Sequence, residues 1–100
     1  MIEAMLQTHP SDPFLHYALA LEWQKEGDLQ KAIDHLLELK SLKSDYLALY
    51  YQLGKMYESL GQNEMAVDTF IDGRRLAKNI GDIKAAGELS EALMMHDIFD

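Results

Sequence analysis

Apolar residues recur at intervals of three and four positions along almost the whole chain, and short polar stretches separate the runs. This spacing indicates α-helices that bury one face, because positions three and four apart lie on the same side of a helix. No segment alternates apolar and polar residues over the length of a strand. The pattern therefore predicts an all-α fold of five to six helices.

Capping residues and glycines mark where these helices begin and end. Ser11-Asp12-Pro13 supplies a cap side chain followed by a proline, and Asp28 and Ser44-Asp45 are further cap residues. Glycines such as Gly27 and Gly61 are typical of helix ends. The expected helices are a short one over residues 2–8 and longer ones over 13–25, 28–43, 44–60, 64–79 and 83–98.

Two of the expected helical hairpins share a sequence pattern with a period of 34 residues. Small residues allow the helices of a hairpin to approach closely, and large apolar residues fill the space beside the contact. We therefore expect the repeated apolar positions to pack the hairpins. The matching pairs are Leu19 with Leu53, Ala20 with Gly54, Trp23 with Tyr57, Ala32 with Ala66, and Leu36 with Phe70, and the turn glycines Gly27 and Gly61 keep the same offset.

This pattern resembles the tetratricopeptide repeat, whose period is 34 residues. Leu-Ala-x-x-Trp begins at Leu19 and Leu-Gly-x-x-Tyr at Leu53, and each is followed by a turn glycine, an alanine and a large apolar residue. The resemblance is to a small, bacterial-type member of the family. It implies a right-handed superhelix of antiparallel helix hairpins, which is an α-α solenoid. The implied single domain, 1–100, has a first repeat at 13–43, a second at 44–80 and a partial repeat or capping helix at 83–98.

The helix expected over residues 13–25 carries a second apolar face, away from the one that bears Leu19. In the family the corresponding face lines a concave groove that holds a peptide, so the resemblance implies a protein-interaction module. The candidate groove residues are Phe14, Tyr17, Leu21, Tyr51 and Lys55. The alternative is that residues 2–8 or the last helix cover this face within the molecule.

Self-assembly is a second possible function. A solenoid usually needs about three repeats and polar caps, which this sequence lacks. Apolar residues also crowd its last seven positions, namely Met94, Met95, Ile98 and Phe99. The homo-oligomeric scaffold therefore stays open as an alternative to peptide binding.

An excess of acidic side chains makes nucleic acid an unfavourable partner. The 17 Asp and Glu residues against 9 Lys and Arg give a net charge of −8, which repels a phosphate backbone. No apolar run reaches the length of about 18 residues that a membrane helix needs, and the first residues do not form a signal peptide. Cysteine is absent, which suits a reducing compartment. We expect a protein or peptide partner, no nucleic acid, no membrane, and a cytoplasmic location.

The sequence contains no motif that is typical of a catalytic site. The four histidines include no pair at the four-residue spacing by which one helix face holds a metal. Neither a nucleophile elbow nor a glycine-rich phosphate loop is present. A basic cluster over residues 74–84 could receive an acidic segment, although cations at a helix C-terminus also stabilise the helix itself. We expect no enzyme activity, no cofactor and no metal.

Overall fold

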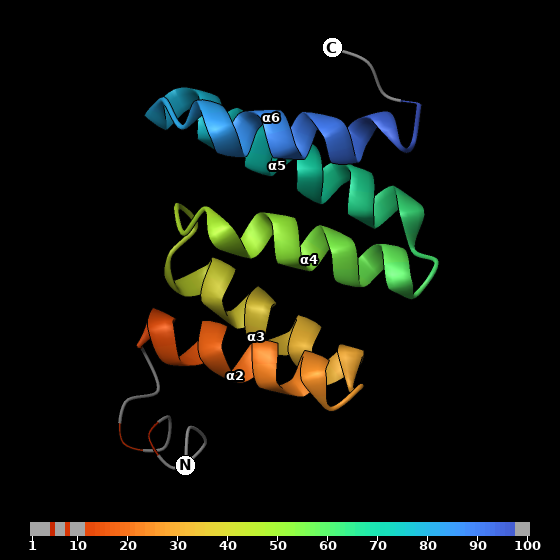
Figure 1. Cartoon of the computed structure of the whole chain (residues 1–100). Coiled ribbons are helices and arrows are strands. Elements are labelled where there is room, and N and C mark those ends of the chain that lie inside the picture. The colour runs from red at the N-terminus through yellow and green to blue at the C-terminus, as the bar shows by residue number, and fades with distance from the viewer. Residues whose placement is uncertain (1–4, 6–7, 9–11, 98–100) are drawn as a thin grey trace. The chain divides into compact units, whose positions relative to one another are not determined.

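The computed structural model describes residues 5, 8 and 12–97 of the chain. Residues 12–97 form five α-helices, and every regular element within this range is helical (Figure 1). The chain divides into two compact units, Met1–Leu49 (unit 1) and Tyr50–Asp100 (unit 2). The helices are α2 Pro13–Lys25, α3 Leu29–Leu42, α4 Ala48–Ser59, α5 Asn63–Ile80 and α6 Ile83–Met94. The predicted all-α fold of sequential helical hairpins is confirmed.

Aspartate side chains begin three of the helices. The Asp12 carboxylate accepts a hydrogen bond of 2.9 Å from the backbone N–H of Phe14, and Asp28 caps α3 in the same way. Asp82 accepts from the backbone N–H of Ala85 at 3.0 Å and caps α6. Each cap satisfies an N–H group that has no partner within its own helix.

Gly27 and Gly61 occupy equivalent turns, one after α2 and one after α4. Their φ angles are +89° and +76°, in the left-handed region that favours glycine. The turn glycines of the two hairpins therefore have the same conformation, as the sequence pattern predicts.

The helix predicted to start at Ser44 begins instead at Ala48. The Asp45 carboxylate forms an ion pair of 3.0 Å with Lys43, and the backbone N–H of Tyr46 bonds the carbonyl oxygen of Lys43 in a turn. The predicted cap at Ser44-Asp45 is therefore wrong, because Asp45 pairs with a side chain before the helix begins.

The last helix ends at Met94 and not at Ile98. The backbone N–H groups of His96 and Asp97 donate to carbonyl oxygens three residues earlier, and Asp97 has a φ of +61°. These tighter bonds and the left-handed residue end the α-helix. The helix predicted over 2–8 lies mostly outside the described residues, of which Met5 and Thr8 are helical.

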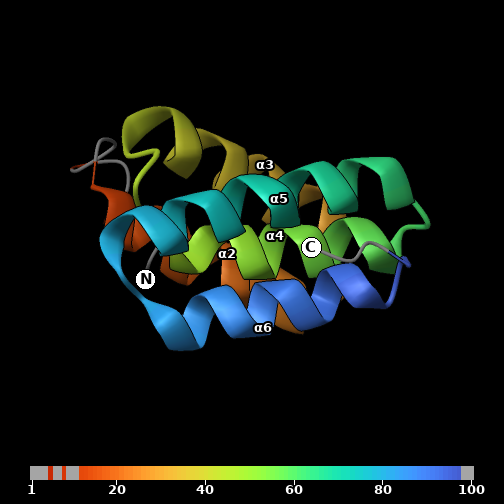
Figure 2. The ribbon, with the colours of Figure 1, turned by 90° about the horizontal axis from the view of Figure 1, so that it is seen from above.

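Unit 1 is built on α2 and α3, which lie side by side (Figures 1 and 2). The predicted packing residues Leu19, Ala20, Ala32 and Leu36 are buried at their interface. Trp23 is partly exposed, and the Lys31 ammonium lies 4.3 Å from the centre of its ring. The other buried apolar residues of this unit are Leu15, Ile33, Leu39 and Leu49.

Unit 2 has α4 against α5, and α5 against α6 (Figure 2). A methyl group added to Gly54 in α4 would lie only 2.3 Å from Cε1 of Phe70 in α5. The three nearest atoms to such a methyl group all belong to the ring of Phe70. The predicted packing residues of this unit are all buried, namely Leu53, Gly54, Tyr57, Ala66 and Phe70.

A second close approach lies at Gly73 in α5, which the sequence pattern does not indicate. A methyl group there would lie 2.6 Å from Cβ of Tyr50 and 3.3 Å from Cδ1 of Leu89. Residues of α4, α5 and α6 therefore meet at this point.

No helix in the described part of the chain combines the length and apolarity needed to cross a membrane. The cytoplasmic location stays a prediction, as does the division into repeats within one domain.

Candidate functional site

The five candidate groove residues are divided between the two units. Phe14, Tyr17 and Leu21 belong to α2 in unit 1, and Tyr51 and Lys55 belong to α4 in unit 2. Each unit therefore presents its own part of the predicted surface.

On α2, the three residues differ in exposure. Phe14 is 64% exposed, whereas Tyr17 and Leu21 are partly buried. The Tyr17 ring lies against that of Tyr46, with a centroid distance of 5.3 Å and an angle of 42° between the planes. Phe14 is thus the most exposed of the three, and Tyr17 is held in place by a neighbour from the same unit.

On α4, Tyr51 and Lys55 border an open depression that also involves α6. It is lined by Tyr51, Lys55, Glu88, Glu91, Ala92 and Met95. Tyr51 is 38% exposed, and its ring lies 6.2 Å from the Phe70 ring, measured between centroids. The Lys55 ammonium lies 6.0 Å from the centre of the same tyrosine ring. Met95 is 80% exposed. The end of α6 therefore borders Tyr51 and leaves its ring accessible.

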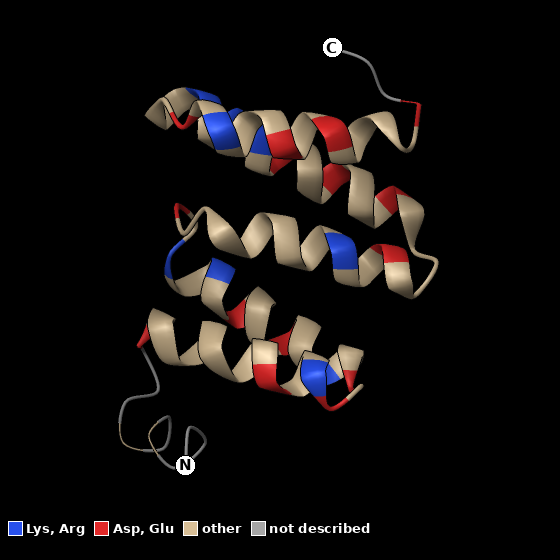
Figure 3. Ribbon diagram, in the orientation of Figure 1, with Lys and Arg blue, Asp and Glu red and all other residues tan. Residues whose placement is uncertain are grey.

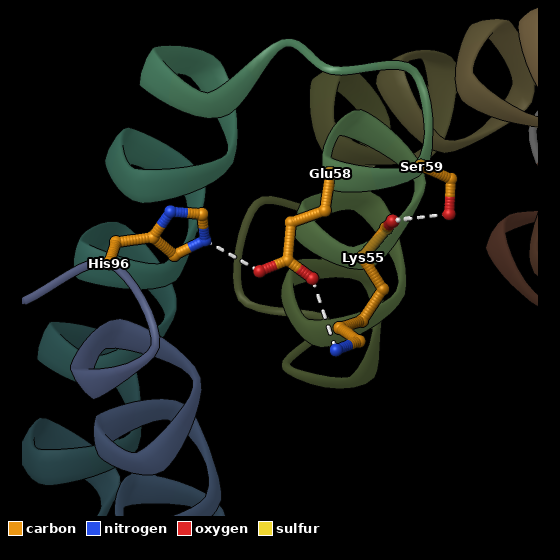
Figure 4. Close-up of polar contacts among 4 residues, drawn as sticks. All are labelled: Lys55, Glu58, Ser59 and His96. Carbon is orange, nitrogen blue, oxygen red and sulfur yellow. Dashed lines mark hydrogen bonds and ion pairs between the residues drawn. The ribbon is translucent and has the colours of Figure 1, made fainter.

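Lys55 belongs to a polar network with Glu58 and His96 (Figure 4). The Lys55 ammonium lies 3.0 Å from Oε1 of Glu58, and Nε2 of His96 lies 2.6 Å from Oε2 of the same carboxylate. The His96 ring also approaches Phe70, with 6.4 Å between centroids. The network thus links α4 to the turn that follows α6.

The pKa of Glu58 reflects two opposed influences. Burial raises this pKa, and hydrogen bonds with His96 and Lys55 lower it. The lowering effects together are larger, so the pKa of Glu58 is below the ordinary 4.5. The hydrogen bond with Glu58 raises the pKa of Lys55 above its ordinary 10.5, against a smaller opposing effect of burial. Lys55 is therefore a fixed cation whose charge is balanced by Glu58.

Sequence spacing could have indicated only half of this network. Lys55 and Glu58 are three residues apart and lie on one helix face. His96 is 38 residues beyond Glu58 on another element, and nothing local marks it as a partner.

The structure also brings His16 and His35 together in unit 1. Their Nδ1 atoms are 3.4 Å apart, and His16 is buried. One ring nitrogen can donate while the other accepts, so the pair joins α2 to α3. Among the described residues, no three His, Asp or Glu side chains gather in a way that could hold a metal ion.

The basic residues over 74–84 include one ion pair at the side of α5. Arg75 Nη1 lies 3.2 Å from Oδ1 of Asp72, one helical turn earlier.

Comparison with known proteins adds evidence to the fold and the repeat pattern. No family model matches the sequence. The crystal structure of a tetratricopeptide repeat domain protein from Salinibacter ruber has a TM-score of 0.80 and 37% identity, covering 86% of this chain and 96% of that one. A solution NMR structure of a tetratricopeptide repeat domain protein from the same organism has a TM-score of 0.81 and 38% identity, covering 86% and 87%. The chain belongs to the tetratricopeptide repeat family.

Two further similarities are to a solved structure and to a curated protein. The crystal structure of MamA has a TM-score of 0.71 at 17% identity, covers 96% of this chain and 64% of that one, and shows likeness of fold alone. Anaphase-promoting complex subunit 3 of Dictyostelium discoideum is 30% identical over 69 residues. The match spans 7% of the length of that curated relative. Tetratricopeptide repeat domains are generally protein-interaction modules and are typically non-catalytic.

Proposed function

We propose that this chain binds a peptide or a partner protein through a set of mainly aromatic and apolar residues on α2 and α4, without catalytic turnover. The contact residues are Phe14, Tyr17 and Leu21 on α2, and Tyr51 and Lys55 on α4. The observation that carries the proposal is the open depression in unit 2, where the accessible ring of Tyr51 borders the exposed side chain of Met95. We also propose that 13–43 and 44–80 are the complete repeats of one domain, and that 83–98 is a partial repeat or capping helix.

The contacts behind this surface support a binding role. Phe70 lies behind the ring of Tyr51, and Glu58 holds the ammonium group of Lys55. Side chains that are already ordered lose less conformational entropy when a partner binds. Tyrosine is also enriched among the residues that contribute most to binding energy at interfaces.

A displayed library of random peptides tests the proposal. Selection on the wild-type protein should enrich peptides that bind it. The affinity of these peptides should fall about tenfold or more for the double variant Phe14→Ala with Tyr51→Ala. The matched control is Leu37→Ala with Leu60→Ala, which removes two other exposed apolar side chains, 41% and 42% exposed, and should leave affinity unchanged. Thermal melts of both variants establish that they are folded.

Two results would contradict peptide binding at these residues. One is a selection that enriches no peptide. The other is a set of enriched peptides that bind the Phe14 and Tyr51 variant as tightly as the wild type.

Self-association is the second candidate function, favoured by the exposure of two isoleucines near the junction of α5 and α6. Ile80 is 58% exposed and Ile83 is 86% exposed. Neighbouring exposed apolar side chains are typical of association surfaces. Light scattering over a range of concentrations should show a mass above 11.4 kDa that Ile80→Ser with Ile83→Ser returns to the monomer value. A monomer at every concentration would exclude this alternative.

A further inference from the structure

We infer that the depression between α4 and α6 is selective for a positively charged peptide that carries apolar residues between its lysines or arginines. This inference rests on the proposed function, because it specifies the chemistry of the peptide that Tyr51 would contact. It concerns unit 2 alone, where all the lining residues lie.

The first argument is the charge of the lining residues. Glu88 and Glu91 are exposed, lie three residues apart on α6 and both line the depression. Within the described part of the chain, neither carboxylate has an ion-pair partner. Acidic positions of α6 are visible along its ribbon in Figure 3. A basic partner would complement these two charges.

The second argument concerns the single cation in the lining. The Lys55 ammonium is already paired with Glu58 at 3.0 Å, and this carboxylate also bonds His96. An acidic peptide would have to compete with Glu58 for Lys55 while lying close to Glu88 and Glu91. The uncompensated charge in the depression is therefore negative, although a lysine takes part in its lining.

The third argument is the apolar part of the same surface. Tyr51 and Met95 are both exposed. Ala92, which follows Glu91 in the sequence, also lines the depression. Methionine adapts to irregular apolar shapes. In an extended peptide, alternate side chains point to the same face about 7 Å apart. A peptide that alternates apolar and basic residues can therefore offer its apolar face to Tyr51 and Met95. Its lysines then start from the opposite face, and their long side chains fold back past the edge of the peptide backbone to reach Glu88 and Glu91.

Two synthetic peptides test this specificity by fluorescence anisotropy. The first is a fluorescein-labelled dodecapeptide in which lysine alternates with leucine, and the second replaces every lysine with glutamate. The lysine peptide should bind wild-type protein at least about tenfold more tightly at low salt, and the ratio should shrink as salt rises, because screening weakens exposed charge pairs.

Paired variants separate a local effect of Glu88 and Glu91 from the acidity of the whole chain. Glu88→Gln with Glu91→Gln should weaken binding of the lysine peptide about three- to tenfold, as expected for two partly solvated charge pairs. The matched control, Glu38→Gln with Asp68→Asn, makes the same change in net charge at exposed positions of α3 and α5. It should change the affinity less than about twofold.

The outcomes distinguish this inference from the proposed function on which it rests. If both peptides bind wild type equally, or if the control variant loses as much affinity as the Glu88 and Glu91 variant, charge selectivity at this depression is wrong. Peptide binding itself would still stand in that case. If Tyr51→Ala with Met95→Ala leaves the affinity for both peptides unchanged, the depression is not the peptide site and both proposals fail.

Discussion

Single residues decide how closely the helices of unit 2 can approach one another. The ring of Phe70 fills the space left by the missing side chain of Gly54, and Cβ of Tyr50 lies in the space left at Gly73. The two neighbours differ in their freedom to move, because an aromatic ring can rotate about its side-chain bonds and a Cβ atom is fixed to the backbone. An added methyl group at Gly73 would therefore meet an atom that cannot move without its backbone.

Gly73→Ala should lower the free energy of unfolding by about 1–3 kcal/mol, because the new methyl group would lie 2.6 Å from Cβ of Tyr50. Gly87→Ala is the matched control, since nothing beyond its own stretch of helix backbone lies within 4 Å of an added Cβ there. It should raise stability by about 0.5–1 kcal/mol through helix propensity alone. Urea denaturation of both variants measures these differences. Equal effects of the two substitutions would contradict the close approach at Gly73.

The pKa of Glu58 gives a second prediction for a single residue. Because its pKa in the folded state is below the ordinary 4.5, ionised Glu58 contributes stability above that pH and loses it as the pH falls through the folded value. The pKa of Lys55 is shifted in the opposite direction, above the ordinary 10.5. The contribution of charged Lys55 to stability is therefore present below pH 10.5 and is lost as the pH rises through the pKa of Lys55 in the folded state. Both contributions are therefore present near neutral pH.

Glu58→Gln should lower the urea midpoint at pH 7, and the difference from wild type should shrink once the pH falls below the ordinary 4.5 and disappear below the lowered pKa of Glu58 in the folded state. Glu38→Gln, at an exposed position of α3, serves as the control and should cause no comparable loss at pH 7. A Glu58 variant whose deficit persists in acid would show that its carboxylate charge is not the source of the stability.

At the scale of elements, local signals predict most helix starts, and a competing local contact accounts for the exception. The beginnings of α2 and α3 follow from the caps at Asp12 and Asp28, which act within a few residues of their own position. The predicted start of α4 is wrong because Asp45 pairs with Lys43. Sequence spacing alone does not distinguish a capping aspartate from one that forms a surface ion pair.

The candidate surface is predictable to a similar degree. The helical periodicity points to Tyr51 and Lys55, because they share a face of their own helix. It does not point to Glu91 or Met95, because no local signal shows which residues of α6 come to lie beside α4. Long-range pairs such as Glu58 with His96 are unpredictable for the same reason.

Two aspartates test the distinction between a cap and a surface ion pair. Asp82→Ala should lower the free energy of unfolding by about 1 kcal/mol, because its side chain accepts a hydrogen bond from the backbone N–H of Ala85 at the start of α6. Asp45→Ala should change stability by less than about 0.5 kcal/mol, since it removes only an exposed ion pair with Lys43. Chemical denaturation measures both. A larger loss at Asp45 than at Asp82 would mean that Asp45 has a structural role beyond that ion pair.

For the whole molecule, the dominant property is the net charge of −8. Copies of the chain repel one another at low ionic strength, and salt weakens the repulsion over a distance of about 10 Å at 0.1 M. The same charge attracts a basic peptide, and salt weakens that attraction. Binding of a basic peptide and self-association therefore respond to salt in opposite directions.

The opposite salt dependence of peptide binding and self-association can be tested with a synthetic peptide and the purified chain alone. If the chain binds a basic peptide through Glu88 and Glu91, affinity for the lysine–leucine dodecapeptide should fall as NaCl is raised from about 0.02 to 0.5 M. If it self-associates through Ile80 and Ile83, the mass from light scattering should rise over the same range, because like charges are screened while apolar contacts are not. Ile80→Ser with Ile83→Ser should abolish the rise in mass and leave peptide affinity unchanged. Peptide affinity that is independent of salt, together with a constant monomer mass, would contradict both the basic-peptide inference and self-association.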